Sequence, residues 1–448
     1  MAHHPHRPVP PTPEEATRDL LDWLRNRGPS WLVIGLFFVL GLVGVVCVAM
    51  LILSGPEPRV KWGYTAAVTA FLFSTTQSAP VLAFATRFAK GYWAIPLRRV
   101  AEIYSVGGLV TTPLFIVLLY QLPEWHGRPS IWNDWPGAPL FWDSIAISLI
   151  TFAGLALLYL TNIPDFAAAR DAGMGGMYRR LALGWTGTKR QWKVLNTGLV
   201  PFGAFYLMWL TYTHLFMVSD LAISLVPGWH SAIFPPYHEI SGLQAGVATT
   251  LIGLYLLRRL GHLERYIGVD PFWGASKLML GLTLLFFYFT WSEFLPYWYG
   301  KLPEEERLID LLMLGVYRGF FILSFSLCFI TPFLLLIWNP IRKSITGPTT
   351  VACIILTGHF IDRLRIYVAS WSVAGPVGHH MTVMPPVNWA TALDLGVIVG
   401  AISGMIFCYL VMLKIVPPIS VWEVKTGLLY TTERRYVKSE VAVVAKPG

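Results

Sequence analysis

Residues 211–246 concentrate side chains that accept and donate protons. The segment reads TYTHLFMVSDLAISLVPGWHSAIFPPYHEISGLQAG and joins two long apolar stretches. Three histidines and two carboxylates fall within it: His214, Asp220, His230, His238 and Glu239. It contains no Lys or Arg, and its prolines stop a continuous helix. We therefore expect a short, rigid, half-buried cap at one membrane face, and we interpret it as the mouth of a redox ligand site.

Ionisable residues also lie inside the apolar stretches that follow, where each costs on the order of 3 kcal/mol to insert. Glu293 and Arg318 lie near the ends of two such stretches. About halfway along another lie His359, Asp362 and Arg363, at spacings that place all three on one face of a helix. Neutralisation of Asp362 by an arginine is the structural explanation, and a proton or quinone role is the functional one.

Four further polar residues lie in or beside the earlier apolar stretches. Gln77 lies in a run of Ser and Thr, where polar residues serve either helix packing or a ligand and proton role. Asp143 opens one stretch and Asp165 closes it, as helix caps do. Glu102 follows Arg98 and Arg99, so a solvated salt bridge is its simplest interpretation.

The composition requires a membrane protein with many spans. Of the 448 residues, 55% are hydrophobic and 13% charged, and the mean hydropathy is +0.55, so a soluble domain could not hide its apolar surface. Apolar runs of roughly 18 residues or more predict an all-α protein with ten transmembrane helices. The predicted spans are residues 31–53, 64–86, 101–121, 143–164, 197–219, 240–257, 272–295, 314–338, 350–373 and 393–414.

The net charge of +9 is a topology signal. Lys and Arg outside the spans fall mainly in the two terminal segments and in alternate loops, which is the positive-inside pattern. We therefore expect both termini in the cytoplasm and no nucleic-acid partner. Residues 12–28 begin with a Thr-Pro-Glu-Glu capping pattern and carry apolar residues at helical spacing, which predicts an amphipathic helix on the inner membrane surface.

The four cysteines provide no metal site. They form no CxxC motif, no CxxCH haem attachment and no iron-sulfur ligand set, and each lies inside an apolar span: Cys47, Cys328, Cys353 and Cys408. We expect no metal, haem or iron-sulfur cluster in this chain. If electrons pass, a partner chain carries the metal centres.

A short internal similarity suggests two related halves. Residues 122–128 read LPEWHGR and residues 295–301 read LPYWYGK, four spans apart. This offset predicts two four-helix bundles, formed by spans 2–5 and 6–9, with two peripheral spans. The expected division of the chain is 1–30, 31–63, 64–219, 220–373, 374–414 and 415–448.

Five segments resemble the NrfD/polysulfide reductase membrane-subunit family. They are WDSIAISLITFAGLALLYLTNIPDFAAARDAG, YRRLALGWTGTKRQW, SDLAISLVPGWHSAIFPPY, KLMLGLTLLFFYFTWSEFLPYWYGKLPEEE and GHFIDRLRIYVAS. Within the family, the sequence is most similar to the quinol-oxidising membrane subunits (ActC) of bacterial alternative complex III. The resemblance covers most of residues 70–373.

The resemblance implies a ten-span subunit of the bacterial inner membrane that binds menaquinol or another quinol near the outer face. It implies electron transfer to an outer iron-sulfur subunit, molybdopterin-like or ferredoxin-like. It further implies a second NrfD-like chain among the membrane partners and cytochrome c or an oxidase downstream. Many family members carry a histidine in the second span where this chain has Gln77, which can hydrogen-bond a quinone carbonyl but cannot titrate near neutral pH.

Three sets of residues follow for the implied reaction, in which a quinol loses two protons and two electrons. His230, with Asp143 or Glu293, is expected to accept the protons. The expected quinol pocket adds six residues, with aromatic rings flanking the quinol ring: Gln77, Asp220, Trp229, Phe234, Tyr237 and His238. A proton path is expected along six more: Glu102, Asp165, Arg318, His359, Asp362 and Arg363.

Three other functions remain open at this point. The membrane anchor of a molybdenum reductase of the polysulfide type would run electrons in the opposite direction. A secondary transporter would also explain paired bundles and buried charges. Gly-interrupted spans in matching places of both halves would favour it, and the sequence does not show them. A b-type cytochrome needs histidine pairs at matched depth on facing helices, and His214 and His359 lack clear mates in the sequence.

Overall fold

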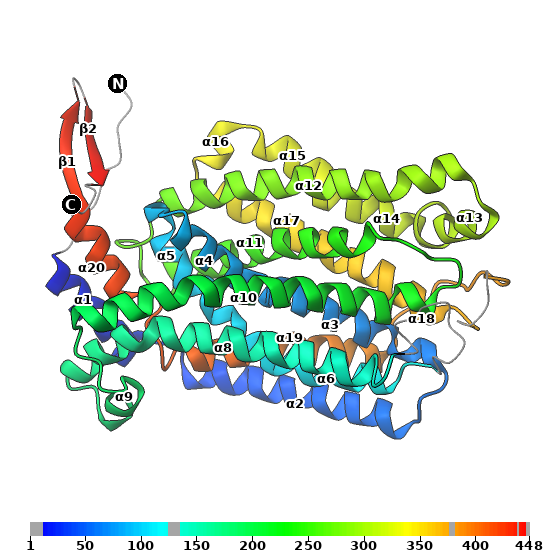
Figure 1. Cartoon of the computed structure of the whole chain (residues 1–448), viewed down its shortest axis with the longest axis horizontal. Helices are drawn as coiled ribbons and strands as arrows, with labels where there is room; N and C mark the ends of the chain where they lie inside the picture. Colours follow the sequence, from blue (N-terminus) through cyan, green and yellow to red (C-terminus); the bar gives the residue numbers. More distant parts are fainter. Residues whose placement is uncertain (1–11, 124–134, 376–380, 437–438, 445–448) are drawn as a thin grey trace.

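The computed structural model describes residues 12–123, 135–375, 381–436 and 439–444. Helices run roughly parallel and antiparallel in one elongated body (Figure 1). The first half contains α1 (Pro13–Asp22), η1 (Trp23–Arg27), α2 (Trp31–Leu53), η2 (Arg59–Trp62), α3 (Gly63–Thr76), α4 (Ala79–Phe88), η3 (Tyr92–Ala94), α5 (Ile95–Ile103), η4 (Tyr104–Gly107), α6 (Gly108–Tyr120), α8 (Leu140–Asp171), α9 (Gly176–Leu181) and α10 (Lys189–Leu221).

The second half begins with η5 (Ile223–Leu225) and continues through α11 (Phe234–Leu260), α12 (Asp270–Gly300), α13 (Pro303–Ile309), η6 (Asp310–Leu314), α14 (Arg318–Phe325), η7 (Ser326–Ile330), α15 (Thr331–Leu336), α16 (Asn339–Arg342), α17 (Thr346–Arg363), η8 (Leu364–Val368), α18 (Ala369–Ser372), α19 (Ala392–Met412) and α20 (Val421–Tyr430). Two antiparallel strands, β1 (Thr431–Tyr436) and β2 (Ser439–Val444), follow.

Nine helical segments of the described residues are long and apolar enough to cross a membrane, and each coincides with one of the ten predicted spans. The remaining predicted span, 350–373, falls on the continuous helical run α17–η8–α18, which carries Asp362, Arg363 and Arg365. The multi-span, all-helical membrane body is thus confirmed. Several helices extend beyond the apolar windows, because a helix can continue into the polar interface; α10, for example, begins at Lys189 rather than at 197.

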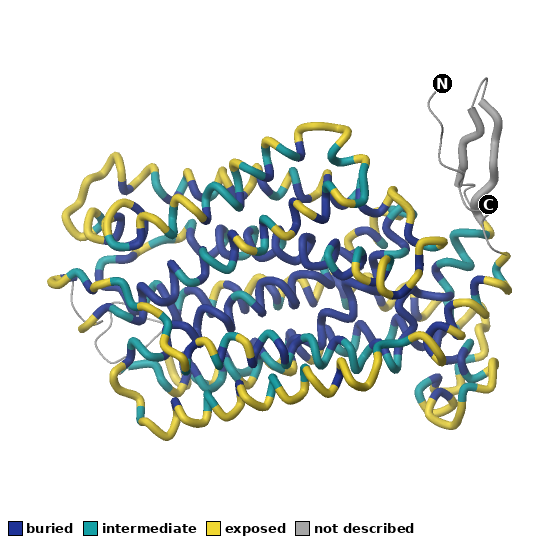
Figure 2. The backbone as a smooth tube through the Cα atoms, turned by 180° about the vertical axis from the view of Figure 1, so that it is seen from behind, coloured by how far each residue is buried: buried dark blue, intermediate teal, exposed yellow. Residues whose placement is uncertain are grey.

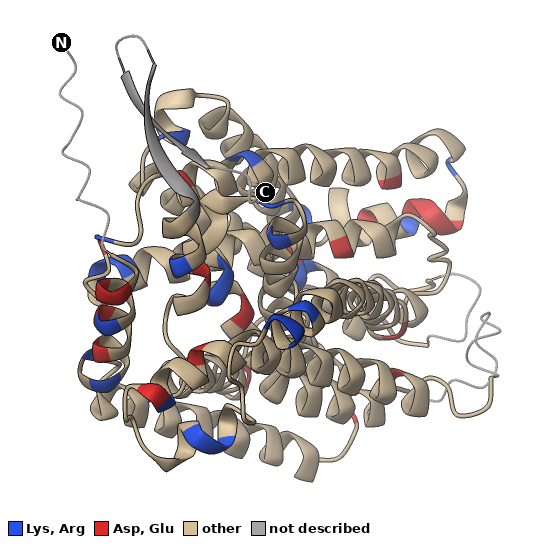
Figure 3. Cartoon of the chain, turned by 60° about the vertical axis from the view of Figure 1, so that its left-hand side comes forward, with Lys and Arg blue, Asp and Glu red and all other residues tan. Residues whose placement is uncertain are grey.

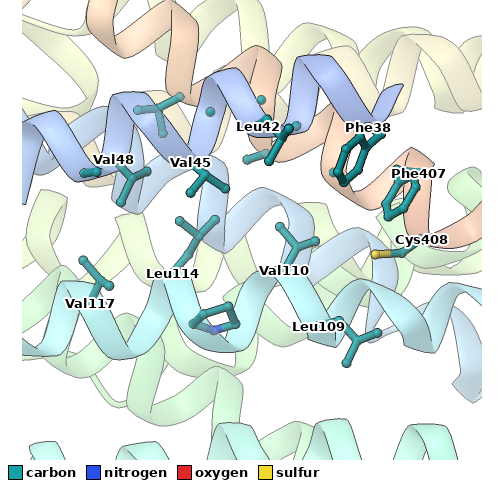
Figure 4. A pocket seen from close by; sticks show the side chains of 18 of the residues that line it. Phe38, Leu42, Val45, Val48, Leu109, Val110, Leu114, Val117, Phe407 and Cys408 are labelled. Carbon is teal, nitrogen blue, oxygen red and sulfur yellow. The ribbon is translucent and has the colours of Figure 1, made fainter. Parts of the chain in front are cut away.

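The interior is formed by α3, α4 and α11, whose residues are mostly buried, and by α17, half of whose residues are buried (Figure 2). The edge helices are more exposed, and many of their exposed side chains are apolar. At one edge α2 pairs with α19. A Cβ atom on Gly44 would lie 2.5 Å from the Cα of Gly400, so this pair can approach only because both positions are glycine. A cavity of about 430 Å³, lined by apolar groups and Cys408, lies between α2, α6 and α19 (Figure 4).

Several spans are interrupted in their middle. The second span breaks at Gln77 and Ser78, between α3 and α4, and the third passes through the 3-10 turn η4. In the second half, the π-helical turns η7 and η8 lie within helical runs, and a third π-turn, η6, lies just before the span that begins at Arg318. A π-turn displaces carbonyl groups from the regular i→i−4 ladder and is frequently found at functional sites.

The two ends of the body differ in charge. The end formed by α1, α9, α16 and α20, here called the basic end, carries most of the Lys and Arg side chains outside the spans (Figures 1 and 3). The end formed by α13, α18 and residues 226–233 is called the distal end. The predicted helix at residues 12–28 is present with its capping box, formed by Thr12 and Glu15. Its apolar face packs on the protein rather than on lipid: Leu20 is fully buried, and the Trp23 indole donates to the Gly261 carbonyl.

Candidate functional site

Two buried histidines from neighbouring spans form the centre of the site. Nδ1 of His214, on α10, lies 2.8 Å from Nδ1 of His238, on α11. The other ring nitrogens face hydroxyl groups, with Nε2 of His238 2.9 Å from Tyr367 and Nε2 of His214 3.3 Å from Ser78. These four side chains are called the histidine chain. The sequence predicted a short cap within residues 211–246 and placed His238 in the quinol pocket, but it did not predict the pairing of the two histidines. In the structure only residues 226–233 separate η5 from α11.

The hydrogen atoms of the histidine chain can be placed in two ways without moving any of its heavy atoms. A neutral imidazole donates from one nitrogen and accepts at the other, so only one of the two facing Nδ1 atoms carries a hydrogen. If His238 donates to His214, Tyr367 donates at one end and Ser78 accepts at the other. If His214 donates instead, every bond in the chain reverses. Exchange between the two arrangements moves one proton along the chain.

An ion cluster lies directly beside the histidine chain. Asp362, on α17, accepts from Arg365 at 2.7 Å and from Arg363 at 3.2 Å. The Tyr237 hydroxyl donates to the same carboxylate at 2.8 Å. All four side chains are buried. The cluster contains two guanidinium groups and one carboxylate, so its net charge is one positive unit.

Arg363 connects the ion cluster to the histidine chain. Its Nη2 donates to the Ser241 hydroxyl at 2.6 Å, to Ser74 at 3.2 Å and to the backbone carbonyl of His238 at 3.3 Å. A guanidinium group presents donors in a planar fork, so it can hold α3, α11 and α17 together at one point. The histidine chain and the ion cluster therefore form one network, called the central network.

The π-turns supply acceptors to this network. The Leu312 carbonyl, in η6, accepts from Arg365 at 3.1 Å, and the Cys328 carbonyl, in η7, accepts from Gln244 at 3.0 Å. Gln244 in turn faces His359, with its Oε1 2.9 Å from the ring Nε2. The Nδ1 atom of His359 has no hydrogen-bond partner among the described residues. The irregular turns thus expose carbonyl groups that stabilise buried donors.

The central network lies in the distal half of the body. His214 lies seven residues before the end of α10, and His238 lies four residues after the start of α11. At 1.5 Å per residue, these positions are roughly 10 Å and 6 Å from the distal helix ends.

A second group of polar residues lies at the distal end itself. Glu293, on α12, accepts from the Ser231 hydroxyl at 2.5 Å and from Tyr297 at 3.1 Å. Tyr297 also lies within hydrogen-bond distance of the His230 carbonyl, at 3.3 Å, while the His230 side chain is exposed. The structure thus brings Glu293 to the loop that carries His230.

A row of aromatic rings joins this distal loop to the central network. Ring centroids of Trp229 and Phe234 are 4.7 Å apart, and those of Phe234 and Tyr237 are 5.2 Å apart. The row continues through Phe286 to His359, with centroid distances of 5.4 and 5.8 Å. The three aromatic residues expected around a quinol ring are therefore adjacent, and they end at the Tyr237 hydroxyl that donates to Asp362.

Asp143 and Asp220 form a separate pair between α8 and α10. Both carboxyl groups are buried, and they interact electrostatically with each other. In Figure 1, α8 and α12 lie on opposite sides of α10 and α11, so the structure does not bring Asp143 together with Glu293.

The remaining predicted residues lie in other surroundings. The Gln77 amide donates to the Ser105 carbonyl at 3.1 Å, and its Oε1 accepts from Tyr206 at 3.2 Å, so protein groups occupy both ends. Arg318 is exposed at the start of α14, away from the buried part of the central network.

Glu102 and Asp165 belong to a network at the basic end. Arg99 bridges them, at 3.2 Å from Glu102 and 2.8 Å from Asp165. Arg87 pairs with Glu102 at 2.7 Å and with Glu423, on α20, at 2.9 Å. Arg98 also pairs with Glu423, at 3.2 Å. This clamp holds α20 to the spans, and the Trp422 amide adds a bond to Asp165.

Sequence reasoning missed several residues in and around the central network: His214, Tyr367, Arg365, Ser78, Ser241 and Gln244. Arg365 stands three residues after Asp362, a spacing that predicts an ion pair on a helix. Tyr367 carries no comparable signal. It reaches His238 after the π-turn η8, which the sequence does not reveal.

No family model matches the sequence, and no curated protein matches it. Among the described residues, no group of three or more His, Cys, Asp and Glu side chains could hold a metal ion. The internal similarity at residues 122–128 lies mainly outside the described residues.

Proposed function

We propose that this chain is an integral membrane subunit that binds and oxidises a quinol, menaquinol being the expected type, near the distal face. Its electrons pass to an iron-sulfur partner subunit. The observation that supports this best is the central network, in which two imidazoles facing each other lie beside a cluster with one unbalanced positive charge. Resemblance to the NrfD family points to the same reaction.

The chemistry follows from the groups of the network. Oxidation of a quinol releases two electrons and two protons, and loss of the first proton leaves a quinol anion. The unbalanced charge of Arg363 and Arg365 favours such an anion in a low-dielectric interior. The histidine chain accepts this proton at its Tyr367 end and releases another at its Ser78 end, and its hydrogen bonds reverse in the process. Glu293, at the distal loop, is the second acceptor, and Trp229, Phe234 and Tyr237 provide the apolar wall for the ring.

The finer topology belongs to the same proposal. The run α17–η8–α18 is the ninth span in chain order and brings the number of spans to ten, because its 27 residues, from Thr346 to Ser372, extend about 40 Å at 1.5 Å per residue. Spans 2–5 and 6–9 form the two bundles, with α2 and α19 paired at their edge.

The basic end faces the cytoplasm of a bacterial inner membrane, so the iron-sulfur partner and any downstream cytochrome c or oxidase dock at the distal end. A second NrfD-like chain is the expected membrane neighbour. A molybdenum reductase anchor would use the same network in the reverse direction.

A secondary transporter is the second candidate, because spans in both halves contain interruptions, although these do not fall in corresponding spans. Breaks occur at Gln77 and Ser78 in the first half and at η7 and η8 in the second. Interrupted spans in both halves place backbone polar groups at mid-depth, where transporters bind substrates and ions. Substrate uptake into proteoliposomes without any redox partner would favour this candidate.

The test of the redox proposal is low-temperature EPR on the complex purified gently through this chain. Addition of a menaquinol analogue should reduce an iron-sulfur signal, and a quinone-site inhibitor should block that change. The variants His214→Gln and His238→Gln should slow the reduction by about 100-fold, the scale of general acid–base catalysis. The control is His262→Gln, a change to an exposed histidine at the basic end. A complex with an iron-sulfur partner whose signal ignores the quinol would overturn the proposal.

His230 provides a second, separate test. Because it is exposed on the distal loop beside the Glu293 group, His230→Ala should lower quinol turnover while assembly of the complex survives. Unchanged turnover would remove His230 from the site without affecting the histidine chain.

A further inference from the structure

A groove runs along α10 on the basic side of the membrane body. It has a volume of about 390 Å³, and its walls come from α8, α10 and the loop before α10. Along α10, Arg190, Val194, Gly198 and Phe202 follow each other at four-residue steps and so form one stripe of the helix surface. Leu160 and Ile163 of α8 also line the groove.

The groove has the length of one membrane leaflet. From Arg190 to Phe202 the helix rises about 18 Å, and half of a typical hydrocarbon core is about 15 Å. Gly198 keeps the groove open, because a Cβ atom added there would meet no protein atom within 4 Å. An apolar slot of this length, beginning at the basic end, fits one acyl chain of a lipid in that leaflet.

The head of the groove is cationic and aromatic. Trp185 and Arg190 line it at the basic end, and Lys189 and Lys193 are exposed on the same helical turns. Residues 172–219 contain no Asp or Glu, and none of these three cations forms a salt bridge with a described residue. Trp at a membrane interface anchors the headgroup level, and basic pockets between spans bind anionic headgroups.

We propose that this groove binds an anionic phospholipid, with one acyl chain along Val194, Gly198 and Phe202 and the phosphate at Arg190. The apolar cavity between α2, α6 and α19 differs in this respect, since no charged side chain lines it. The inference is independent of the redox function, because it uses none of the residues of the central network or the distal loop.

The experiment measures lipid retention by the purified chain or its complex. Vesicles of phosphatidylcholine, with or without phosphatidylglycerol, supply the lipid, and native mass spectrometry counts what stays bound after detergent extraction. The wild type should retain phosphatidylglycerol in preference to phosphatidylcholine. Arg190→Gln should weaken this retention about fivefold, equivalent to about 1 kcal/mol for one cation near an anionic surface.

Gly198→Leu tests the acyl chain separately, because a Cβ atom at this position meets no protein atom within 4 Å and a larger side chain therefore has room to enter the groove. It should remove phosphatidylglycerol retention, whereas Gly281→Leu, at another exposed glycine with nothing within 4 Å, should not. Lys90→Gln is the control for the charge change, since Lys90 is exposed and lies outside the groove. Equal retention of both lipids by the wild type, or unchanged retention in Gly198→Leu, would overturn the proposal.

Discussion

Two buried polar networks lie at different depths of this protein, and their charge balance separates their roles. The network at the basic end joins three arginines to three carboxylates, so every charge has a counter-charge: Arg87, Arg98, Arg99, Glu102, Asp165 and Glu423. The central network joins two arginines to one carboxylate and adds two histidines. A balanced set of ions holds helices in place, whereas an unbalanced set beside imidazoles can respond to a proton or an anion.

The two networks also differ in how many carboxylate partners remain for each arginine when one carboxylate is removed. Removal of Glu102 leaves Arg87 with Glu423 and Arg99 with Asp165. Removal of the Asp362 charge leaves Arg363 and Arg365 without a carboxylate partner among the described residues. The central network is therefore the more sensitive of the two.

The largest expected effect comes from removing that single carboxylate. Asp362→Asn leaves two buried guanidinium groups uncompensated and should lower the free energy of unfolding by about 3–5 kcal/mol, as for other broken buried pairs. Glu102→Gln should cost less, because its partners keep other carboxylates. Thermal unfolding in detergent, followed by size-exclusion chromatography, compares the two. Equal losses of stability would contradict the difference in redundancy.

The next largest effect is on quinol turnover. It is tested by removing one phenolic hydroxyl from the central network and, as a matched control, one from the basic end. Tyr367→Phe removes one end of the histidine chain and should reduce quinol turnover by about 10- to 100-fold. Tyr178→Phe, at the basic end, removes a hydroxyl that donates to the Ile415 carbonyl at 3.3 Å and should leave turnover unchanged. Steady-state quinol oxidation, normalised to folded complex, measures both. If both variants lost activity alike, the histidine chain would have no special role.

The pH dependence of the basic-end clamp provides a third test. Burial raises the pKa of Glu423, but the charges of Arg87 and Arg98 outweigh it, and the net pKa lies below the usual value. A carboxyl group with a lowered folded-state pKa stabilises the docked helix fully above its unfolded pKa, about 4.3, and this stabilisation is lost as the pH falls through the folded value. α20 should therefore be held at neutral pH and become mobile in acid.

A spin label introduced through Lys425→Cys reports this motion by continuous-wave EPR. The label should gain mobility as the pH falls below about 4.3. In a Glu423→Gln background the transition should disappear. If the label in the Glu423→Gln variant gained mobility with the same pH midpoint, the pH dependence would belong to a group other than Glu423.

The smallest effects come from two hydroxyls at similar distances from their partners. Ser78 lies 3.3 Å from His214, and Thr86 accepts from Arg98 at 3.3 Å. Ser78→Ala and Thr86→Val should each cost about 1 kcal/mol of stability, the usual value of one hydrogen bond. Only Ser78→Ala should also slow quinol turnover, because it shortens the histidine chain. Stability from thermal unfolding and turnover from the quinol assay together give the comparison.

The sequence by itself determined the membrane-spanning character of this protein and the position of nine spans. Exposure of long apolar runs to water is unfavourable. In lipid, a helix is the one structure in which a single segment hydrogen-bonds all of its own backbone N–H and C=O groups. The sequence also indicated the first helix, because the Thr12 and Glu15 cap is a local pattern. His359, Asp362 and Arg363 were recognised as one cluster for a similar reason, since helical spacing links neighbours along one helix.

The pairing of side chains from different helices was decided only by the tertiary structure. His214 and His238 lie on two different helices, and only the packing of α10 against α11 brings their Nδ1 atoms to 2.8 Å from each other. The same packing separated Asp143 from Glu293 and joined Glu423 to arginines more than three hundred residues earlier. Helix periodicity describes one helix at a time, whereas these contacts depend on how several helices rotate and cross, which the interrupted turns at Ser78 and η8 control.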